Sequence, residues 1–104
     1  MIQLELNLTE QEIEEDRAVT LNDCTKRRDS TEDELRERYC NPYGYREVLH
    51  LSYVQHEVIE EYLVAHPAIV LDPTAYRWAY LASQCLFELY QRIGNLESEC
   101  NDGT

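Results

Sequence analysis

The chain has 104 residues, a formal net charge of -12 and 43% hydrophobic residues, which predicts one folded domain with a modest core rather than a disordered acidic segment. A negative surface disfavours direct binding to nucleic acid or to an anionic membrane. No apolar run reaches the roughly 20 residues that a membrane-spanning helix requires, and the first residues lack a signal-peptide pattern. We therefore expect a cytoplasmic protein that binds neither nucleic acid nor membrane directly.

Four cysteines lie far apart along the chain, at Cys24, Cys40, Cys85 and Cys100. None forms the C-x-x-C pair that structural zinc sites use. We expect free thiols in a reducing compartment, with disulfides left open by the spacing alone. No metal and no cofactor are predicted.

The first eight residues alternate in character, with apolar Ile2, Leu4, Leu6 and Leu8 separated by polar residues. This pattern is typical of a β-strand. A strand needs a partner, and the two candidates are the "AIVL" segment at 68–71 and the same segment of a second copy. Residues 1–8 are thus predicted to form a short strand or an arm.

The rest of the chain is predicted to be helical. Thr9 followed by Glu12 fits a capping box, so a first helix begins near Glu10 and runs to the basic "TKRRD" segment, which matches the helix dipole. Ser30 or Thr31 caps a second short helix that ends near position 40. The "NPYG" segment at 41–44 has the composition of a turn.

A third helix is expected over about 45–65, ending before Pro67. A fourth begins at Asp72 and Pro73 and ends before Gly94, which leaves 95–104 as a mobile acidic tail. The predicted fold is mainly α: a single domain over 1–104 built as a bundle of three to four helices.

Helical periodicity assigns faces to the last two helices. The core side of the third is predicted to hold Val48, Leu51, Val54, Val58, Ile59, Tyr62 and Leu63. The fourth is apolar around most of its circumference, which indicates either a central position or contact with another chain. Self-association as a homodimer, through Tyr76, Trp78 and Tyr80, is the expected result.

Catalytic patterns are sparse. Glu47 and His50 form one E-x-x-H pair, whereas di-iron bundles need two such pairs. In "HEVIEE", position 60 is Glu where a zinc protease requires His. The E-x-x-E pair of Glu57 and Glu60 is similar to that of the all-helical nucleotide pyrophosphatases, but the fourth helix lacks their E-x-x-D. A metal-dependent hydrolase that uses Glu47, His50, Glu57 and Glu60 is therefore the least favoured hypothesis, behind a non-enzymatic function.

The acidic run at 10–16 exceeds what helix capping explains. The dipole accounts for acids in the first turn, but not for Asp16 or for Glu14 repeating Glu10 at i+4, where like charges repel. Two interpretations remain open: solubility, or attraction to a basic partner.

The first hypothesis is a small acidic protein that inhibits or adapts a partner with a basic, nucleic-acid-binding surface. A phage-type anti-defence protein or nucleic-acid mimic is its most concrete version. The residues expected to bind the partner are Glu10, Glu12, Glu14, Glu15, Asp16, Leu49, Tyr53, Glu57, Glu60, Glu61 and Val64. The alternative is a self-associating structural or assembly subunit whose acidity serves solubility.

Overall fold

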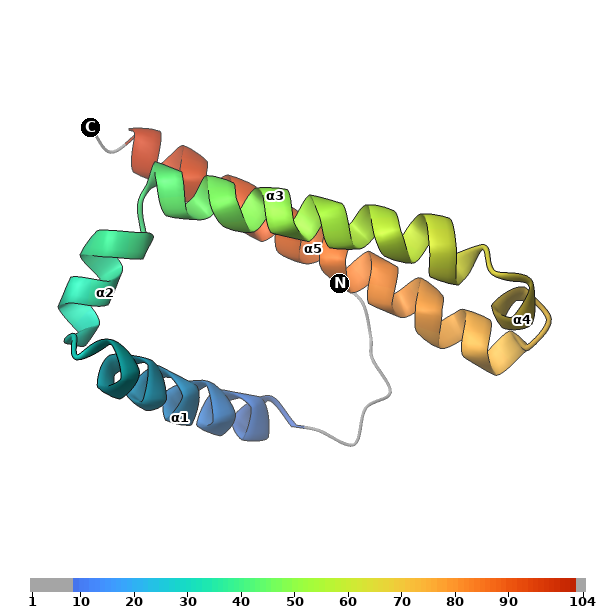
Figure 1. Cartoon of the computed structure of the whole chain (residues 1–104), viewed down its shortest axis with the longest axis horizontal. Helices are drawn as coiled ribbons and strands as arrows, with labels where there is room; N and C mark the ends of the chain where they lie inside the picture. The colour runs from blue at the N-terminus through green and yellow to red at the C-terminus, as the bar shows by residue number, and fades with distance from the viewer. Residues whose placement is uncertain (1–8, 103–104) are drawn as a thin grey trace.

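The computed structural model describes residues 9–102, which are helical almost throughout (Figure 1). The elements in chain order are α1 (Glu10–Arg28), α2 (Glu32–Tyr39), α3 (Pro42–Val58), the π-helical segment η1 (Ile59–Val64), α4 (Pro67–Val70) and α5 (Pro73–Asp102). The mainly α class is confirmed, and the part of the chain that the structure describes contains no strand. The strand expected over 1–8 lies outside the described residues.

The centre of the fold is a long antiparallel hairpin in which α3 and η1 lie beside α5 (Figure 1). Arg46 Nε lies 2.9 Å from Glu97 Oε1 at one end of the pair. Toward the other end, the Ser83 hydroxyl donates to the Glu60 carboxylate. The two contacts are separated by the same number of residues on each helix, so the helices keep the same register relative to each other between these contacts.

Small residues line the seam between the two helices. Ser52, Ala79 and Ser83 are 4%, 6% and 0% exposed, respectively. Small side chains let two helix backbones approach closely, and a seam that repeats every three or four residues favours near-antiparallel packing. Besides Ala79, Val64 is the one apolar residue that is buried among those described. The hairpin therefore has a tight but very thin core.

The prediction of which side of the third helix faces the core is wrong. Val48, Leu51, Val58 and Tyr62 are 36%, 54%, 44% and 66% exposed, and Val54 and Leu63 are exposed as well. Only Ile59 of the predicted set is partly covered. The seam instead runs along the neighbouring face through Ser52, because α5 packs against its small residues. The larger apolar residues of α3 remain on the outside.

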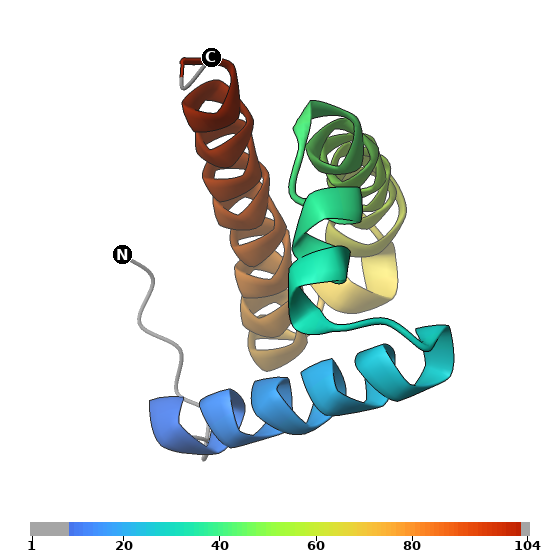
Figure 2. The same ribbon diagram turned by 90° about the vertical axis from the view of Figure 1, so that its left-hand side faces the viewer.

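The two N-terminal helices form an arm rather than two members of a bundle. Among the described elements, α1 approaches only α2, which in turn approaches α3; Figure 1 shows α1 apart from the hairpin, and Figure 2 shows it running crosswise to the hairpin helices. The predicted helix starts are confirmed: Thr9 caps α1, and Thr31 with Glu34 forms a capping box on α2. No residue of either helix is buried, so the expected bundle is replaced by a hairpin with an arm.

Three boundary predictions are wrong. "NPYG" does not form a separate turn, because the Asn41 side chain caps α3 and Pro42 is its first residue. The "AIVL" segment, a candidate strand, forms the short helix α4 with Leu71 as its C-cap. Gly94 does not end the last helix, since α5 continues to Asp102. Most of the predicted acidic tail is thus helical.

The capping box of α2 yields a prediction on its local stability. Replacing Thr31 with alanine removes the hydroxyl that accepts from the Glu34 amide, 3.2 Å away, and is expected to cost about 1 kcal/mol. Hydrogen exchange should show faster exchange of the α2 amides. Thr20→Ala, which removes a hydroxyl bonded to the Asp16 carbonyl within α1, is the control and should leave α2 unchanged.

The same box predicts an acid dependence. The Thr31 backbone amide, followed by its hydroxyl, lowers the pKa of the Glu34 carboxyl from its usual value. Since the folded pKa lies below the unfolded one, Glu34 stabilises α2 above the usual carboxyl pKa, and this contribution disappears as the pH falls through the folded value. An NMR titration should show α2 fraying over that interval. An Asp33→Asn control should retain the transition, whereas Glu34→Gln should lack it.

Candidate functional site

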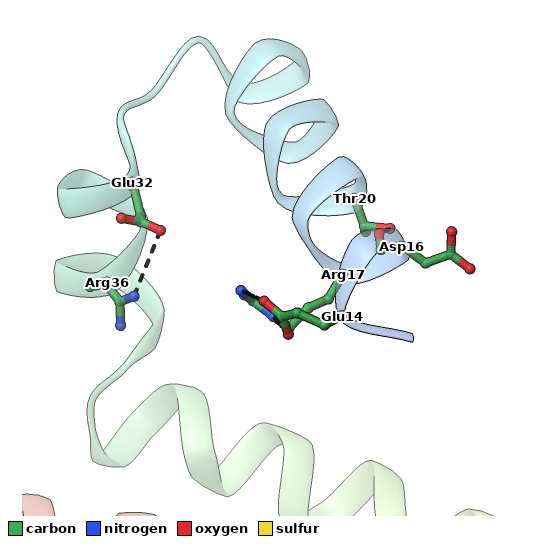
Figure 3. Close-up of polar contacts among 6 residues, drawn as sticks. All are labelled: Glu14, Asp16, Arg17, Thr20, Glu32 and Arg36. Carbon is green, nitrogen blue, oxygen red and sulfur yellow. Dashed lines mark hydrogen bonds and ion pairs between the residues drawn. The ribbon is translucent and has the colours of Figure 1, made fainter. Parts of the chain in front are cut away.

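The acidic run of α1 is fully accessible. Its five carboxylates, Glu10, Glu12, Glu14, Glu15 and Asp16, are exposed. Two have partners within the helix: Glu14 accepts from Arg17, which lowers the pKa of its carboxyl, and Glu15 accepts from Gln11. Figure 3 shows Asp16 directed away from α2, on the side opposite the Glu14–Arg17 pair. Acidic groups thus lie on more than one side of the arm.

Sequence reasoning missed a groove of about 340 Å³ between α1 and α2. Its lining residues are Arg17, Leu21, Cys24, Arg28, Glu32, Leu35, Arg36, Tyr39 and Cys40. Its arginines are already partnered: Arg28 donates to the Tyr39 hydroxyl at 2.7 Å and stacks on that ring, and Arg36 lies 3.7 Å from Glu32 (Figure 3). The available signal was the helical spacing of Arg17, Leu21, Cys24 and Arg28, which places them on one side of α1. The Arg28–Tyr39 contact joins α1 to α2, whereas the Arg36–Glu32 pair lies within α2.

The second acidic group, Glu57, Glu60 and Glu61, lies on α3 and η1. Because α1 approaches neither element, the two acidic groups come from parts of the molecule that do not meet. Glu60 is also turned toward the seam by its bond to Ser83. The partner-binding residues predicted from sequence therefore do not form one continuous acidic surface.

The apolar anchors predicted for a partner occupy different places. Val64 is 8% exposed, and the Leu49 side chain lies against α5 near Gly94, so both belong to the hairpin seam. Tyr53 is exposed and, with Glu57, lines a shallow groove of about 240 Å³. The remaining lining residues are His56, Phe87 and Tyr90. Of the three predicted anchors, only Tyr53 is available to a partner.

A polar cluster beside this groove joins His56, Glu60 and Ser83. His56 Nε2 lies 3.6 Å from Glu60 Oε1, and Ser83 donates its hydroxyl to the same carboxylate. In a hydrolytic triad the serine bonds to the imidazole, whereas here the carboxylate stands between them. Ser83 is fully buried. The cluster therefore joins the two helices and does not present Ser83 as a nucleophile.

The residues considered for a metal-dependent hydrolase are not gathered at one point. Glu47, His50 and Glu57 are exposed along α3, while Glu60 bonds to Ser83. Among the residues that the structure describes, no three His, Cys, Asp or Glu side chains are placed to hold one metal ion. The four cysteines are free thiols.

The main candidate binding surface is one side of the hairpin, which we call the apolar face. It comprises Val48, Leu51 and Val58 of α3, with Trp78, Ala82, Cys85 and Leu89 of α5. At about 100° per residue, these positions all lie on the same side of Ser52 on α3 and of Ala79 on α5, at rotations of up to about a third of a turn. Since the helices run antiparallel, this rotation leads to the same side of the hairpin on both. Trp78 and Leu89 are 41% and 44% exposed.

The opposite side of α5 carries a separate aromatic group. The rings of Tyr76 and Tyr80 have centroids 6.3 Å apart, and Phe87 contacts His56 across the groove. Trp78 lies two residues from both tyrosines, about half a turn round the helix. The three residues predicted for self-association are therefore divided between two sides of α5.

The molecule exposes more surface than a compact monomer of its size. The chain exposes 8405 Å², whereas a globular monomer of this mass exposes about 6,100 Å². The arm, which has no buried residue, contributes part of the difference of about 2,300 Å². The exposed large apolar residues, however, lie mainly on the hairpin.

Comparisons with protein-family models, with curated proteins and with solved structures find no match to this chain. Within the range that the structure describes, no helix combines the length and the apolar character needed to cross a membrane.

Proposed function

We propose that this protein is a non-enzymatic assembly subunit that self-associates through its helical hairpin. The observation that carries the proposal is the apolar side of α3 and α5, which stays accessible while Val64 and Ala79 are the buried apolar residues of the described chain. Such a surface is typical of a protein interface rather than of an isolated monomer.

The energetics of a thin core support this function. Ordering a residue costs roughly 1–2 kcal/mol of backbone entropy, and burial of apolar area offsets this at about 25 cal/mol per Å². With a seam of small residues, the hairpin obtains little of this stabilisation from within one chain. Contact with another apolar surface adds burial without requiring any change in the backbone.

The test is the dependence of thermal stability on protein concentration. If folding is coupled to self-association, the melting temperature rises with concentration, and sedimentation equilibrium gives a mass above 12.3 kDa. A melting temperature that is constant over a hundredfold range of concentration, together with a monomeric mass, would contradict the proposal.

A second candidate function is attraction of a basic partner by the arm. It is supported by the exposure of every residue in the acidic run of α1 and by its separation from the hairpin. Charge of this kind raises the rate of association more than the affinity. In this version the protein is an inhibitor or adaptor of a nucleic-acid-handling protein.

A pair of matched charge reversals tests the arm. Glu12→Lys with Asp16→Lys changes α1, whereas Glu57→Lys with Glu61→Lys changes the hairpin by the same charge. Capture of a basic partner from lysate at about 0.1 M salt should fall at least tenfold for the first pair and less than threefold for the second. Equal loss for both pairs would show that net charge, and not the arm, is responsible.

A further inference from the structure

We propose that the apolar face binds the same face of a second copy of this chain, with α3 of each copy lying over α5 of the other. The result is a twofold-symmetric, antiparallel four-helix bundle from which two acidic arms extend. This inference rests on the proposed self-association and specifies its surface and geometry.

The choice of face follows from its polarity. Obligate homodimer interfaces are depleted of charge at their centre. Between Val48 and Val58, the one polar residue facing the same way as the apolar face is Gln55, and Arg92 lies only at the edge. The opposite side carries His56, Glu57 and Glu60 around its groove. The apolar face is thus the less costly of the two to remove from water.

The exposed surface is larger than that of a compact monomer, as a chain with an unpartnered interface requires. Obligate homodimers bury about 2,000–5,000 Å² in total, or roughly 1,000–2,500 Å² from each subunit. The surface of 8405 Å² exceeds that of a compact monomer by about 2,300 Å², and the apolar face and the arm each contribute part of this excess. Because α1 approaches only α2 among the described elements, a second copy on the apolar face leaves the arm in solvent.

Two twofold arrangements bring the faces together, and edge charge separates them. If α3 lies over its own copy, Glu47 faces a helix that has no arginine or lysine between Val48 and Val58, so its charge stays uncompensated there. If α3 of one copy lies over α5 of the other, the twofold axis is parallel to the helices. Each residue and its counterpart in the second copy then stand at the same level, that is, at the same height along the hairpin. Arg46 opposite Glu97 and Ser83 opposite Glu60 define these levels. Glu47 then lies within about one helical turn of Arg92 of the partner subunit.

The same levels place Val58 opposite Cys85 of the partner subunit, on the same outer side of the bundle. Within one chain the two positions lie on adjacent helices but diverge from the seam, which is unfavourable for a disulfide. An intermolecular disulfide at this pair would therefore report the proposed arrangement. Native Cys85 supplies one of the two thiols.

The experiment uses a full-length chain with Cys24, Cys40 and Cys100 replaced by serine, with and without Val58→Cys, oxidised with diamide. We expect the Val58→Cys variant to form a covalent dimer through Cys85 of the partner subunit, and the parent to stay monomeric on a non-reducing gel. The matched control is Tyr53→Cys, on the opposite side of α3, which should not cross-link. Circular dichroism verifies that each variant is helical.

The outcomes separate the geometry from the function. A parent that is dimeric by sedimentation but cross-links through its own Cys85 pair, or a Tyr53→Cys variant that cross-links best, would overturn the arrangement and keep self-association. A helical parent that is monomeric at all concentrations would overturn both.

Charge exchange gives an independent test. Glu47→Arg or Arg92→Glu alone should raise the dimer dissociation constant about tenfold, because each places like charges at the same edge. The double variant restores opposite charges and should return to within about threefold of the native value. A double variant as weak as the sum of the singles would overturn the pairing of α3 with α5.

Discussion

Replacing Trp78 with alanine is expected to dissociate the protein at concentrations where the native chain is associated. Trp78 is the largest side chain of the apolar face and is 41% exposed in a single copy. Truncating a buried tryptophan at the centre of an interface typically costs 2 kcal/mol or more. The dissociation constant should therefore rise about thirtyfold or more, as measured by sedimentation equilibrium.

Tyr80→Ala is the matched control for Trp78. Tyr80 lies on the same helix, is 48% exposed and has its ring tilted against that of Tyr76 on the opposite side. Its loss should change the dissociation constant less than threefold. If Tyr80→Ala weakens association as much as Trp78→Ala, both sides of α5 are interfaces and the apolar face is not sufficient. If neither has an effect, the surface that self-associates lies elsewhere.

Gly44→Ala is expected to displace the arm from the hairpin. A Cβ atom at Gly44 would lie 1.9 Å from the carbonyl oxygen of Tyr39, the last residue of α2, and 2.8 Å from its carbonyl carbon. Both are backbone atoms, so no side-chain rotation relieves the clash. Overpacking of this kind typically costs about 1–3 kcal/mol. The melting temperature should fall by several degrees, and small-angle scattering should show a radius of gyration different from the native one.

Gly94→Ala is the control for this prediction, because the same change is made where there is space. A Cβ atom at Gly94 would meet only Leu49 Cδ2, at 4.0 Å. Alanine is favoured over glycine in a helix by about 1 kcal/mol, so the melting temperature should stay constant or rise. A Gly44→Ala protein as stable and as compact as the native one would show that the junction of α2 and α3 adapts.

The two candidate functions are separable in the molecule. Self-association uses the hairpin, where apolar area provides affinity, whereas attraction of a basic partner uses α1, where charge provides the rate of encounter. Because α1 approaches only α2, a change on the apolar face should leave the arm able to bind. Trp78→Ala and the Glu12–Asp16 reversal should therefore affect different assays.

Local signals determined much of the secondary structure. Thr9, Thr31 and Pro73 mark helix starts because capping and proline chemistry act within a few residues of the chain, and all three helices begin where they predict. The same local reasoning failed at Gly94. Glycine is only weakly unfavourable in a helix, and packing of the segment against α3 outweighs that cost.

The tertiary structure decided which face of each helix is inside. Periodicity ranks faces by apolar content, and by that criterion Leu51 and Val58 belong to a core. The hairpin instead packs through Ser52, Ala79 and Ser83, because small residues let the backbones approach, and a sequence read one helix at a time cannot show how close a partner helix comes. The sequence alone indicated that the last helix is apolar around most of its circumference, which left open a central position or contact with another chain. Only the fold showed that Leu51 and Val58 of α3 stay exposed on the same side as Trp78 and Leu89 of α5, because the two helices approach each other through small residues instead.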